Sequence, residues 1–276
     1  MNRIDAIFAR ARSSGSPLLM PFICGGHPSL GDGPGLLRAL EEGGAGIVEI
    51  GFPFSDPIAD GPVIAAAMHA ALERGVTPDA IFRQVESVRA GLGVGLVAMV
   101  SASIVFRAGG PAGFARRAAA AGFDGVIYPD APLEEAAELL SAARAEGLTA
   151  SLLIAPTTSP ERAEAIAGAC SGFVYLLART GITGERGEAP DVGRRVARLR
   201  EATPLPIACG FGISTPEHVR AVVAHADAAI VGSALIRRID QAGPGGSASA
   251  AAGSFMAELS RALPRAPIPG AAAGSA

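Results

Sequence analysis

Eight short apolar runs alternate with longer segments rich in Ala, Leu, Arg and Glu along this chain of 276 residues. We expect strands at residues 18–24, 46–50, 95–99, 125–128, 150–154, 172–177, 206–209 and 228–231. We expect helices at 35–42, 78–90, 112–121, 133–146, 160–170, 191–201 and 216–224. Strands that alternate with helices pair in parallel through right-handed crossovers, and eight such strands close a barrel of about 250 residues. The predicted fold class is therefore α/β, a single (β/α)8 TIM barrel with extra short helices.

The helix starts and the chain ends fit this organisation. Thr77, Ser159 and Thr215 are each followed by Pro and an acid, which predicts an N-cap with Pro at the first helical position. A doubly wound open sheet is the alternative, but residues 24–28 (CGGHP) do not make its GxGxxG fingerprint. The predicted barrel domain is 1–263, closed by a helix near 250–263. The tail 264–276, rich in Pro, Ala and Gly, is expected to be disordered.

Composition excludes several classes of function. A formal net charge of −3, no Trp and only 5% aromatic residues argue against nucleic-acid binding. The three cysteines lack metal-ligand spacing, and Cys24 and Cys209 are expected to be reduced core residues. We therefore expect no metal site. The N-terminus lacks an apolar signal region and no segment is long enough to span a membrane, so we expect a cytoplasmic protein.

Glu49 stands out because it interrupts an apolar run that should be buried on both faces of the sheet. A carboxylate at the carboxyl end of a barrel strand is expected to be catalytic, although an ion pair or a loop cap is an alternative. Asp60 lies on the following loop, where catalysis and helix capping are about equally expected. Asp56 precedes Pro57 and fits an Asx turn. Asp130 is expected to cap the helix that follows it.

Three loops of small residues follow the last three predicted strands, at 180–184, 210–214 and 231–234. Barrels commonly bind phosphate with the loops after strands 7 and 8 and a short extra helix, here predicted at 233–236. For Gly212, Gly232 and Ser233 together we favour a phosphate site over glycines that only turn the chain. His27 ends the first predicted strand without the Ser or Cys motif of a nucleophilic triad.

Residues 49–62 (EIGFPFSDPIADGP) resemble the signature of the tryptophan synthase alpha chain family. Further similar motifs follow in the same order as in that family: 20–22 (MPF), 175–184 (YLLARTGITG), 210–214 (GFGIS) and 232–234 (GSA). The resemblance covers roughly residues 1–240. It implies a (β/α)8 barrel that cleaves indole-3-glycerol phosphate to indole and glyceraldehyde 3-phosphate.

The resemblance also implies roles for individual residues. Glu49 would be the acid and base that protonates indole C3, and Asp60 would hold the indole N–H. The resemblance assigns the indole pocket to Phe22 and Tyr175, and the phosphate to Gly184, Gly212, Gly232 and Ser233. Thr183, in a lid at 180–190 with Glu185 and Arg186, would approach Asp60 on closure. Arg179 could bind phosphate or be a solvated charge.

The family also implies a partner. No cofactor is expected in this chain, whereas a beta chain carrying pyridoxal phosphate would dock through Pro53, Asp56 and Pro57 in an alpha2beta2 heterotetramer. Ser101 and Ser103 replace larger residues that are common in the family, and His27 stands where an acid is frequent. Two alternative functions remain: a stand-alone lyase that releases free indole, and a catalytically weak binding partner of a beta chain.

Overall fold

The computed structural model describes residues 1–57, 60–178, 192–210, 212–243 and 246–264. Eight strands form one closed barrel in chain order, and every neighbouring pair is parallel. The strands are β1 (Leu18–Cys24), β2 (Ile47–Gly51), β3 (Gly95–Met99), β4 (Gly125–Tyr128), β5 (Thr149–Ile154), β6 (Val174–Leu177), β7 (Ile207–Gly210) and β8 (Ala228–Val231). The predicted TIM barrel is thus confirmed, and the open-sheet alternative is wrong.

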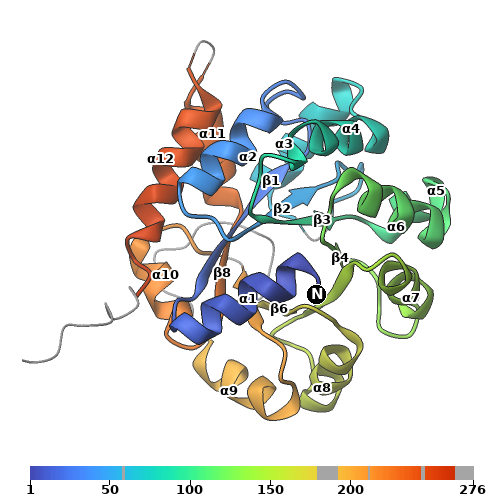
Figure 1. Ribbon diagram of the computed structural model, residues 1–276, viewed down its shortest axis with the longest axis vertical. Helices are drawn as coiled ribbons and strands as arrows, with labels where there is room; N and C mark the ends of the chain where they lie inside the picture. The colour runs from blue at the N-terminus through green and yellow to red at the C-terminus, as the bar shows by residue number, and fades with distance from the viewer. Residues whose placement is uncertain (58–59, 179–191, 211, 244–245, 265–276) are drawn as a thin grey trace, which may run out of the picture.

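Helices surround this barrel on its outside, as Figure 1 shows. Those in the first half of the described chain are α1 (Arg3–Ser14), α2 (Gly33–Glu42), α3 (Pro62–Glu73), α4 (Pro78–Arg89), α5 (Ala102–Arg107) and α6 (Gly110–Ala121). The second half contributes α7 (Ala137–Ala145), α8 (Pro160–Ala169), α9 (Gly193–Ala202), α10 (Pro216–Val223), α11 (Ser233–Gln241) and α12 (Ala248–Ser260). Helices α1, α3 and α5 have no counterpart among the segments named from sequence.

The predicted helix starts are confirmed at three positions. The Thr77, Ser159 and Thr215 side chains accept hydrogen bonds from the backbone N–H three residues ahead, with Pro at the first helical position. The helix expected from residue 133 begins only at Ala137 and lacks a side-chain cap. Asp130 therefore does not cap that helix.

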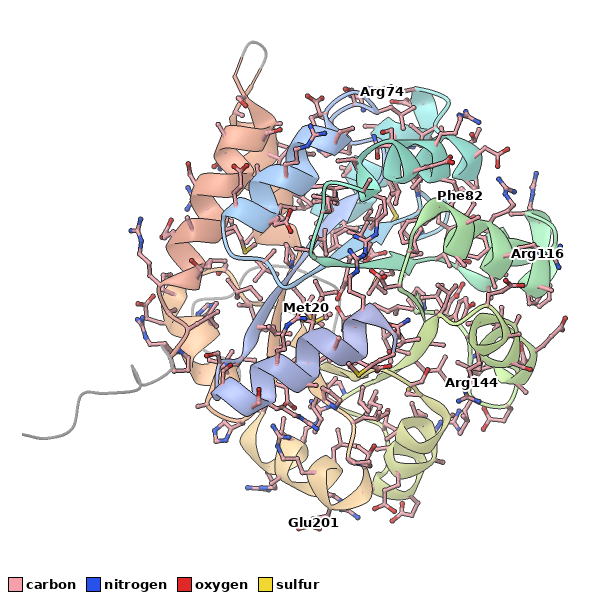
Figure 2. All side chains as sticks on the ribbon, viewed as in Figure 1. Met20, Arg74, Phe82, Arg116, Arg144 and Glu201 are labelled. Atoms are coloured by element: carbon pink, nitrogen blue, oxygen red, sulfur yellow. The ribbon has the colours of Figure 1, made fainter. Side chains whose placement is uncertain are left out.

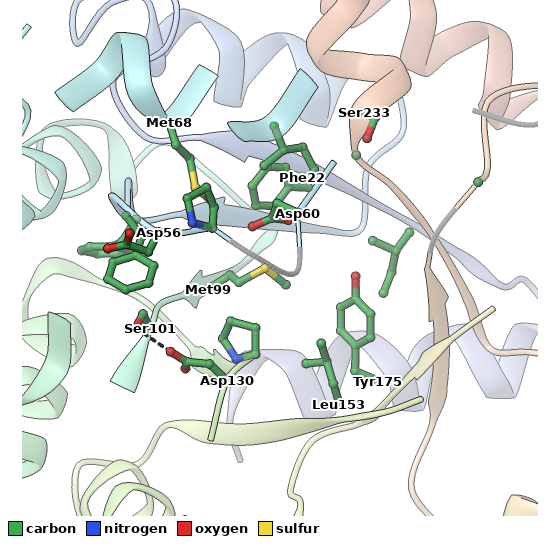
Figure 3. A pocket seen from close by; sticks show the side chains of 18 of the residues that line it. Phe22, Asp56, Asp60, Met68, Met99, Ser101, Asp130, Leu153, Tyr175 and Ser233 are labelled. Carbon is green, nitrogen blue, oxygen red and sulfur yellow. Dashed lines mark hydrogen bonds between the residues drawn. The ribbon is translucent and has the colours of Figure 1, made fainter. Parts of the chain in front are cut away.

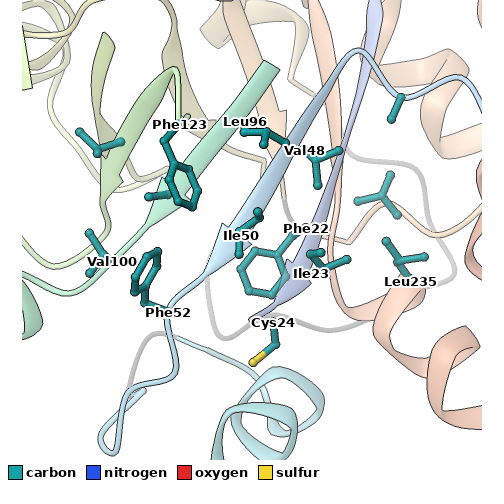
Figure 4. Close-up of a cluster of buried hydrophobic side chains, with 14 of the residues drawn as sticks. Phe22, Ile23, Cys24, Val48, Ile50, Phe52, Leu96, Val100, Phe123 and Leu235 are labelled. Carbon is teal, nitrogen blue, oxygen red and sulfur yellow. The ribbon is translucent and has the colours of Figure 1, made fainter. Parts of the chain in front are cut away.

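Two layers of apolar side chains fill the molecule, because alternate residues of each strand face opposite sides of the sheet. The inner layer includes Met20, Ile47, Val97, Phe173 and Tyr175. The outer layer lies between the barrel and the helices and includes Val48, Ile50, Leu96 and Phe52, seen in Figure 4. Figure 2 shows Met20 near the barrel centre and Phe82 among the outer helices.

Helix α1 crosses one end of the barrel and closes it (Figure 1). Its residues Ile4, Ile7 and Phe8 are buried in the same cluster as the inner layer. This closure at the amino ends of the strands leaves the opposite end of the barrel for a site.

The remaining predictions concern the termini, membranes and metals. Apart from Pro264, the tail 264–276 lies outside the described residues. None of the helices in the described part of the chain is long and apolar enough to cross a membrane. Within the same residues no group of three or more His, Cys, Asp or Glu side chains is placed to hold a metal ion. The three cysteines are free and buried, as expected for core residues.

Candidate active site

A cavity of about 310 Å³ opens at the carboxyl ends of the strands. Figure 3 shows its walls. Most of the lining is apolar, with polar groups at two ends. The lining residues are Phe22, Phe52, Phe54, Asp56, Pro57, Asp60, Ile64, Met68, Met99, Ser101, Pro129, Asp130, Leu153, Tyr175, Gly212, Ile213, Ile230, Gly232, Ser233 and Ala234. An apolar cavity with a few convergent polar groups is the usual form of a small-molecule site.

Glu49 lies on β2 beside Phe22 of β1 and is completely buried. Two residues after the inward-facing Ile47, it points toward the barrel interior. Both carboxyl oxygens lack a hydrogen-bond partner in the described part of the chain. Burial therefore raises the pKa of Glu49 well above its usual value. Burial thus favours the protonated form of the side chain, which is covered by its neighbours rather than lining the cavity.

Asp60 lines the cavity, and its backbone N–H donates to the Pro57 carbonyl at 2.9 Å. Burial raises the pKa of this carboxyl to about 6. Asp60 is therefore mostly ionised at neutral pH, whereas complete burial favours the protonated form of Glu49. Two carboxyl groups with separated pKa values near one pocket are the arrangement of an acid and an electrostatic stabiliser.

Tyr175 is affected electrostatically by both acids. Its pKa is raised well above the usual value, first by burial and then by the charges of Glu49 and Asp60. Glycines at strand ends make room for the two aromatic rings of the pocket. A Cβ at Gly210 would lie 2.7 Å from the Tyr175 hydroxyl oxygen, and one at Gly51 would lie 2.5 Å from Phe22 Cζ.

One end of the cavity is formed by Gly212, Ile213, Gly232 and Ser233. Gly212 has φ +81°, a conformation that favours glycine. The N–H groups of Gly212 and Ile213 form no hydrogen bond within the described residues. Ser233 begins helix α11, where the first N–H groups have no partner within the helix. Free N–H groups and a helix N-terminus together suit a phosphate group.

The opposite end of the cavity carries Ser101 and Asp130 (Figure 3). Ser101 Oγ donates to Asp130 Oδ2 at 2.6 Å, and the Ala102 N–H donates to Asp130 Oδ1 at 2.9 Å. Asp130 therefore stabilises the start of helix α5, and the prediction that it caps the following helix is wrong. Ser103 is exposed outside the cavity and donates its N–H to Ser101 Oγ.

Of the three residues assigned to the partner interface, Asp56 and Pro57 line the cavity and Pro53 does not. Asp56 is exposed there and accepts a hydrogen bond from Ser55 Oγ, and Pro57 is half-buried beside it. Pro53 is buried, so its own side chain is not exposed to a partner. His27 is buried away from the cavity, with Nε2 2.8 Å from Asp240 Oδ1 on helix α11.

Sequence reasoning found the polar groups of the cavity better than its apolar wall. Met68, Met99, Leu153 and Ile230 line the cavity but were not singled out. Each is an ordinary apolar residue of a helix or strand, so only its position on the inward face could identify it. Thr183, Gly184 and the lid residues Glu185, Arg186 and Arg179 lie outside the described residues.

Comparison with known proteins agrees with this geometry. A family model described as "Tryptophan synthase alpha chain" matches residues 8–261. This chain belongs to the tryptophan synthase alpha chain family. The alpha chain of Halorhodospira halophila is 44% identical over 244 residues, covering 88% of this chain and 89% of that relative. The alpha chain of Chloroflexus aggregans is 44% identical, covering 96% and 99%.

Solved structures of the family share the fold. A structure of Mycobacterium tuberculosis tryptophan synthase matches with a TM-score of 0.86 and 32% identity, covering 95% of this chain and 98% of that one. The alpha subunit from Legionella pneumophila matches with a TM-score of 0.84 at the same identity, covering 95% and 98%. The family membership inferred from the motifs is thus confirmed across nearly the whole described barrel.

Proposed function

We propose that this chain carries out the alpha reaction of tryptophan synthase, the cleavage of indole-3-glycerol phosphate to indole and glyceraldehyde 3-phosphate. One observation carries the proposal: a buried Glu49 with a raised pKa and an ionisable Asp60 accompany an apolar cavity, and one end of that cavity presents backbone N–H groups that have no partner among the described residues. Family membership supports the same reaction. The chain is then a carbon–carbon lyase of tryptophan biosynthesis.

The substrate would lie along the cavity with its phosphate at Gly212, Gly232 and Ser233 and its ring between Phe22 and Tyr175. The resemblance assigns Gly184 to the same phosphate and Thr183 to the closing lid. Because both Glu49 oxygens are covered, substrate binding must bring this carboxyl into contact with the ring. The apolar surroundings keep Glu49 protonated until it meets a basic carbon.

The reaction is a retro-aldol cleavage with balanced proton transfers. The Glu49 carboxyl gives its proton to indole C3, and the Asp60 carboxylate stabilises the positive charge that develops at the ring nitrogen. The C3 to side-chain bond then breaks as the Glu49 carboxylate removes the proton of the adjacent hydroxyl. The bond electrons return to the ring, which leaves as indole, and the side chain leaves as the aldehyde. Glu49 ends protonated, ready for another cycle.

We also propose that the chain needs no cofactor of its own, because proton transfers by carboxyl groups suffice for this reaction. The partner is a beta chain that carries pyridoxal phosphate, in an alpha2beta2 heterotetramer. Asp56 and Pro57 at the cavity mouth support a docking surface there. Phe106 on helix α5 is a second candidate contact for the beta chain, since it is 55% exposed and Met1 is the other exposed large apolar side chain of the described residues.

The test is indole release from indole-3-glycerol phosphate by the purified chain, with and without the beta chain of the same source. We expect slow release that rises strongly with the beta chain and is lost in Glu49→Gln. Fast release unchanged by the beta chain would support a stand-alone lyase. Absence of indole in both conditions would contradict the catalytic proposal and leave a binding partner.

A further inference from the structure

His218 is a buried polar residue beneath the phosphate end of the cavity that the proposed chemistry does not use. It is the third residue of helix α10, and only 3% of its surface is exposed. Its Nδ1 lies 3.4 Å from both the backbone nitrogen and the hydroxyl oxygen of Ser214. The imidazole is thus aimed at the loop that joins β7 to α10, the loop that contributes Gly212 and Ile213 to the cavity.

The direction of these hydrogen bonds follows from the donor. A backbone N–H can only donate, so Nδ1 of His218 is the acceptor and carries no proton. The Ser214 hydroxyl donates to the same nitrogen. Each contact is long, but together they place one imidazole nitrogen under both donors of a single loop residue.

The loop has little other polar support within the described chain. Gly212 and Ile213 form no hydrogen bond there, and those of Ser214 end on the imidazole. The backbone N–H of His218 donates to Thr215 Oγ1 at 3.3 Å. His218 therefore contacts both the N-cap of helix α10 and the loop before it. Ser214 is turned toward His218, which leaves the neighbouring Gly212 and Ile213 on the cavity side.

We propose that His218 is a positioning residue that holds the 212–214 loop in the shape that presents its N–H groups to the phosphate of the substrate; this inference rests on the proposed function. Donors that are already ordered bind an anion more tightly than donors that must be ordered on binding. The phosphate does not react, so its contacts are the same in the bound substrate and in the transition state. Loss of the imidazole should therefore raise KM and leave kcat nearly unchanged.

Two substitutions of His218 test this proposal. His218→Leu fills the buried space without an acceptor, whereas His218→Gln keeps an acceptor oxygen on a side chain of similar length. We expect KM for indole-3-glycerol phosphate to rise roughly three- to tenfold in His218→Leu, as for the loss of one or two weak hydrogen bonds. His218→Gln should stay within about twofold of the unchanged protein, and kcat should change less than twofold in both. His69→Leu, at an exposed histidine on α3, is the matched control.

Binding of two small probes separates the phosphate from the ring. Glycerol 3-phosphate, a phosphate monoester without an indole ring, should bind His218→Leu more weakly by the same factor as the KM change. Indole, which has no phosphate, should bind as before. Equal KM values in His218→Leu and the unchanged protein, or equal weakening of both probes, would overturn the proposal. Absence of cleavage by the unchanged protein would instead contradict the proposed function.

Discussion

At the scale of single residues, the site depends on two carboxyl groups that differ in burial, and burial favours the protonated form of a carboxyl group. Glu49 is fully covered, and burial raises its pKa well above the usual value. Asp60 reaches the cavity, and its pKa rises only to about 6. The proposed reaction needs both conditions at once, so its pH dependence follows from these two groups.

The acidic limb of the pH profile should report Asp60. As pH falls through about 6, Asp60 takes up a proton and no longer stabilises the charged ring, so kcat/KM should fall. The substrate phosphate titrates near the same pH. Asp60→Asn is therefore the control. Its kcat/KM should be lower by roughly 100-fold or more, and its pH profile should show only the titration of the substrate phosphate. If the acidic limb of the pH profile had the same shape in Asp60→Asn, Asp60 could not be the group that causes it.

Glu49 should lower the free energy of unfolding at neutral pH. Its pKa is raised by folding, so its contribution to stability is complete below the unfolded pKa and is lost as pH rises through the folded pKa. Glu49→Gln should thus abolish cleavage but raise Tm by a few degrees at pH 8, with a smaller gain at pH 5. Thermal unfolding at both pH values measures this. Glu138→Gln, on an exposed face of α7, should show no such difference.

The sequence identified these acids because each breaks a local pattern. Glu49 interrupts an apolar strand, and Asp60 stands in a loop of Gly and Pro. Met99, Leu153 and Ile230 line the same cavity but read as ordinary strand residues. Asp130 binds the start of helix α5 rather than α7, because the loop after β4 continues to Ala136 instead of ending before residue 133. Side chains that act across strands, such as Phe22 above Gly51, require three-dimensional placement.

At the scale of secondary-structure elements, helix α1 is fixed across the barrel end by two acids that stand four strands apart. Asp124, just before β4, accepts from the Leu96 N–H at 2.9 Å and lies 3.8 Å from Arg3 Nε. Asp227, just before β8, accepts from the Ile207 N–H at 2.8 Å and from Arg12 Nε at 2.9 Å. Each acid joins a neighbouring strand to one end of α1.

Removing one of these acids should loosen that end of the barrel. Asp227→Ala leaves the Ile207 N–H without its acceptor and removes the carboxylate partner of Arg12 and Arg200, which then retain only their backbone acceptors. We expect a loss of about 2–3 kcal/mol in the free energy of unfolding, or roughly 5–10 °C in Tm. Asp227→Asn keeps an acceptor oxygen and should lose less. Equal losses in the two variants would show that the charge alone matters.

The elements themselves were largely predictable, since β1, β3, β4 and β8 begin and end as expected from their apolar runs. The caps at Thr77, Ser159 and Thr215 fixed three helix starts in the same way. The register of the strands and the packing of α1 under the barrel were not predictable, because both depend on contacts between residues far apart in the chain. The segment at 191–201 began two residues later, at Gly193.

At the scale of the whole molecule, the closed end under α1 and the open end with the cavity divide stability from function. Helix α5 is one of the elements that join the cavity to the outer surface. Its N-cap Ser101 lines the cavity, while Phe106 on the same helix is exposed to solvent. A partner that packs on Phe106 would therefore press on a helix anchored to the cavity wall through Ser101 and Asp130.

Phe106→Ser tests this connection. If a beta chain docks on this surface, the loss of a large apolar contact should weaken its association with this chain roughly tenfold or more. The rise in indole release on adding the beta chain should then need a correspondingly higher beta-chain concentration, while release by the isolated chain stays the same. Arg10→Ser, exposed on α1 at the closed end, should leave both unchanged. An unaltered beta-chain titration in Phe106→Ser would place the docking surface away from α5, and the coupling would then have to reach the cavity through Asp56 and Pro57 at its mouth.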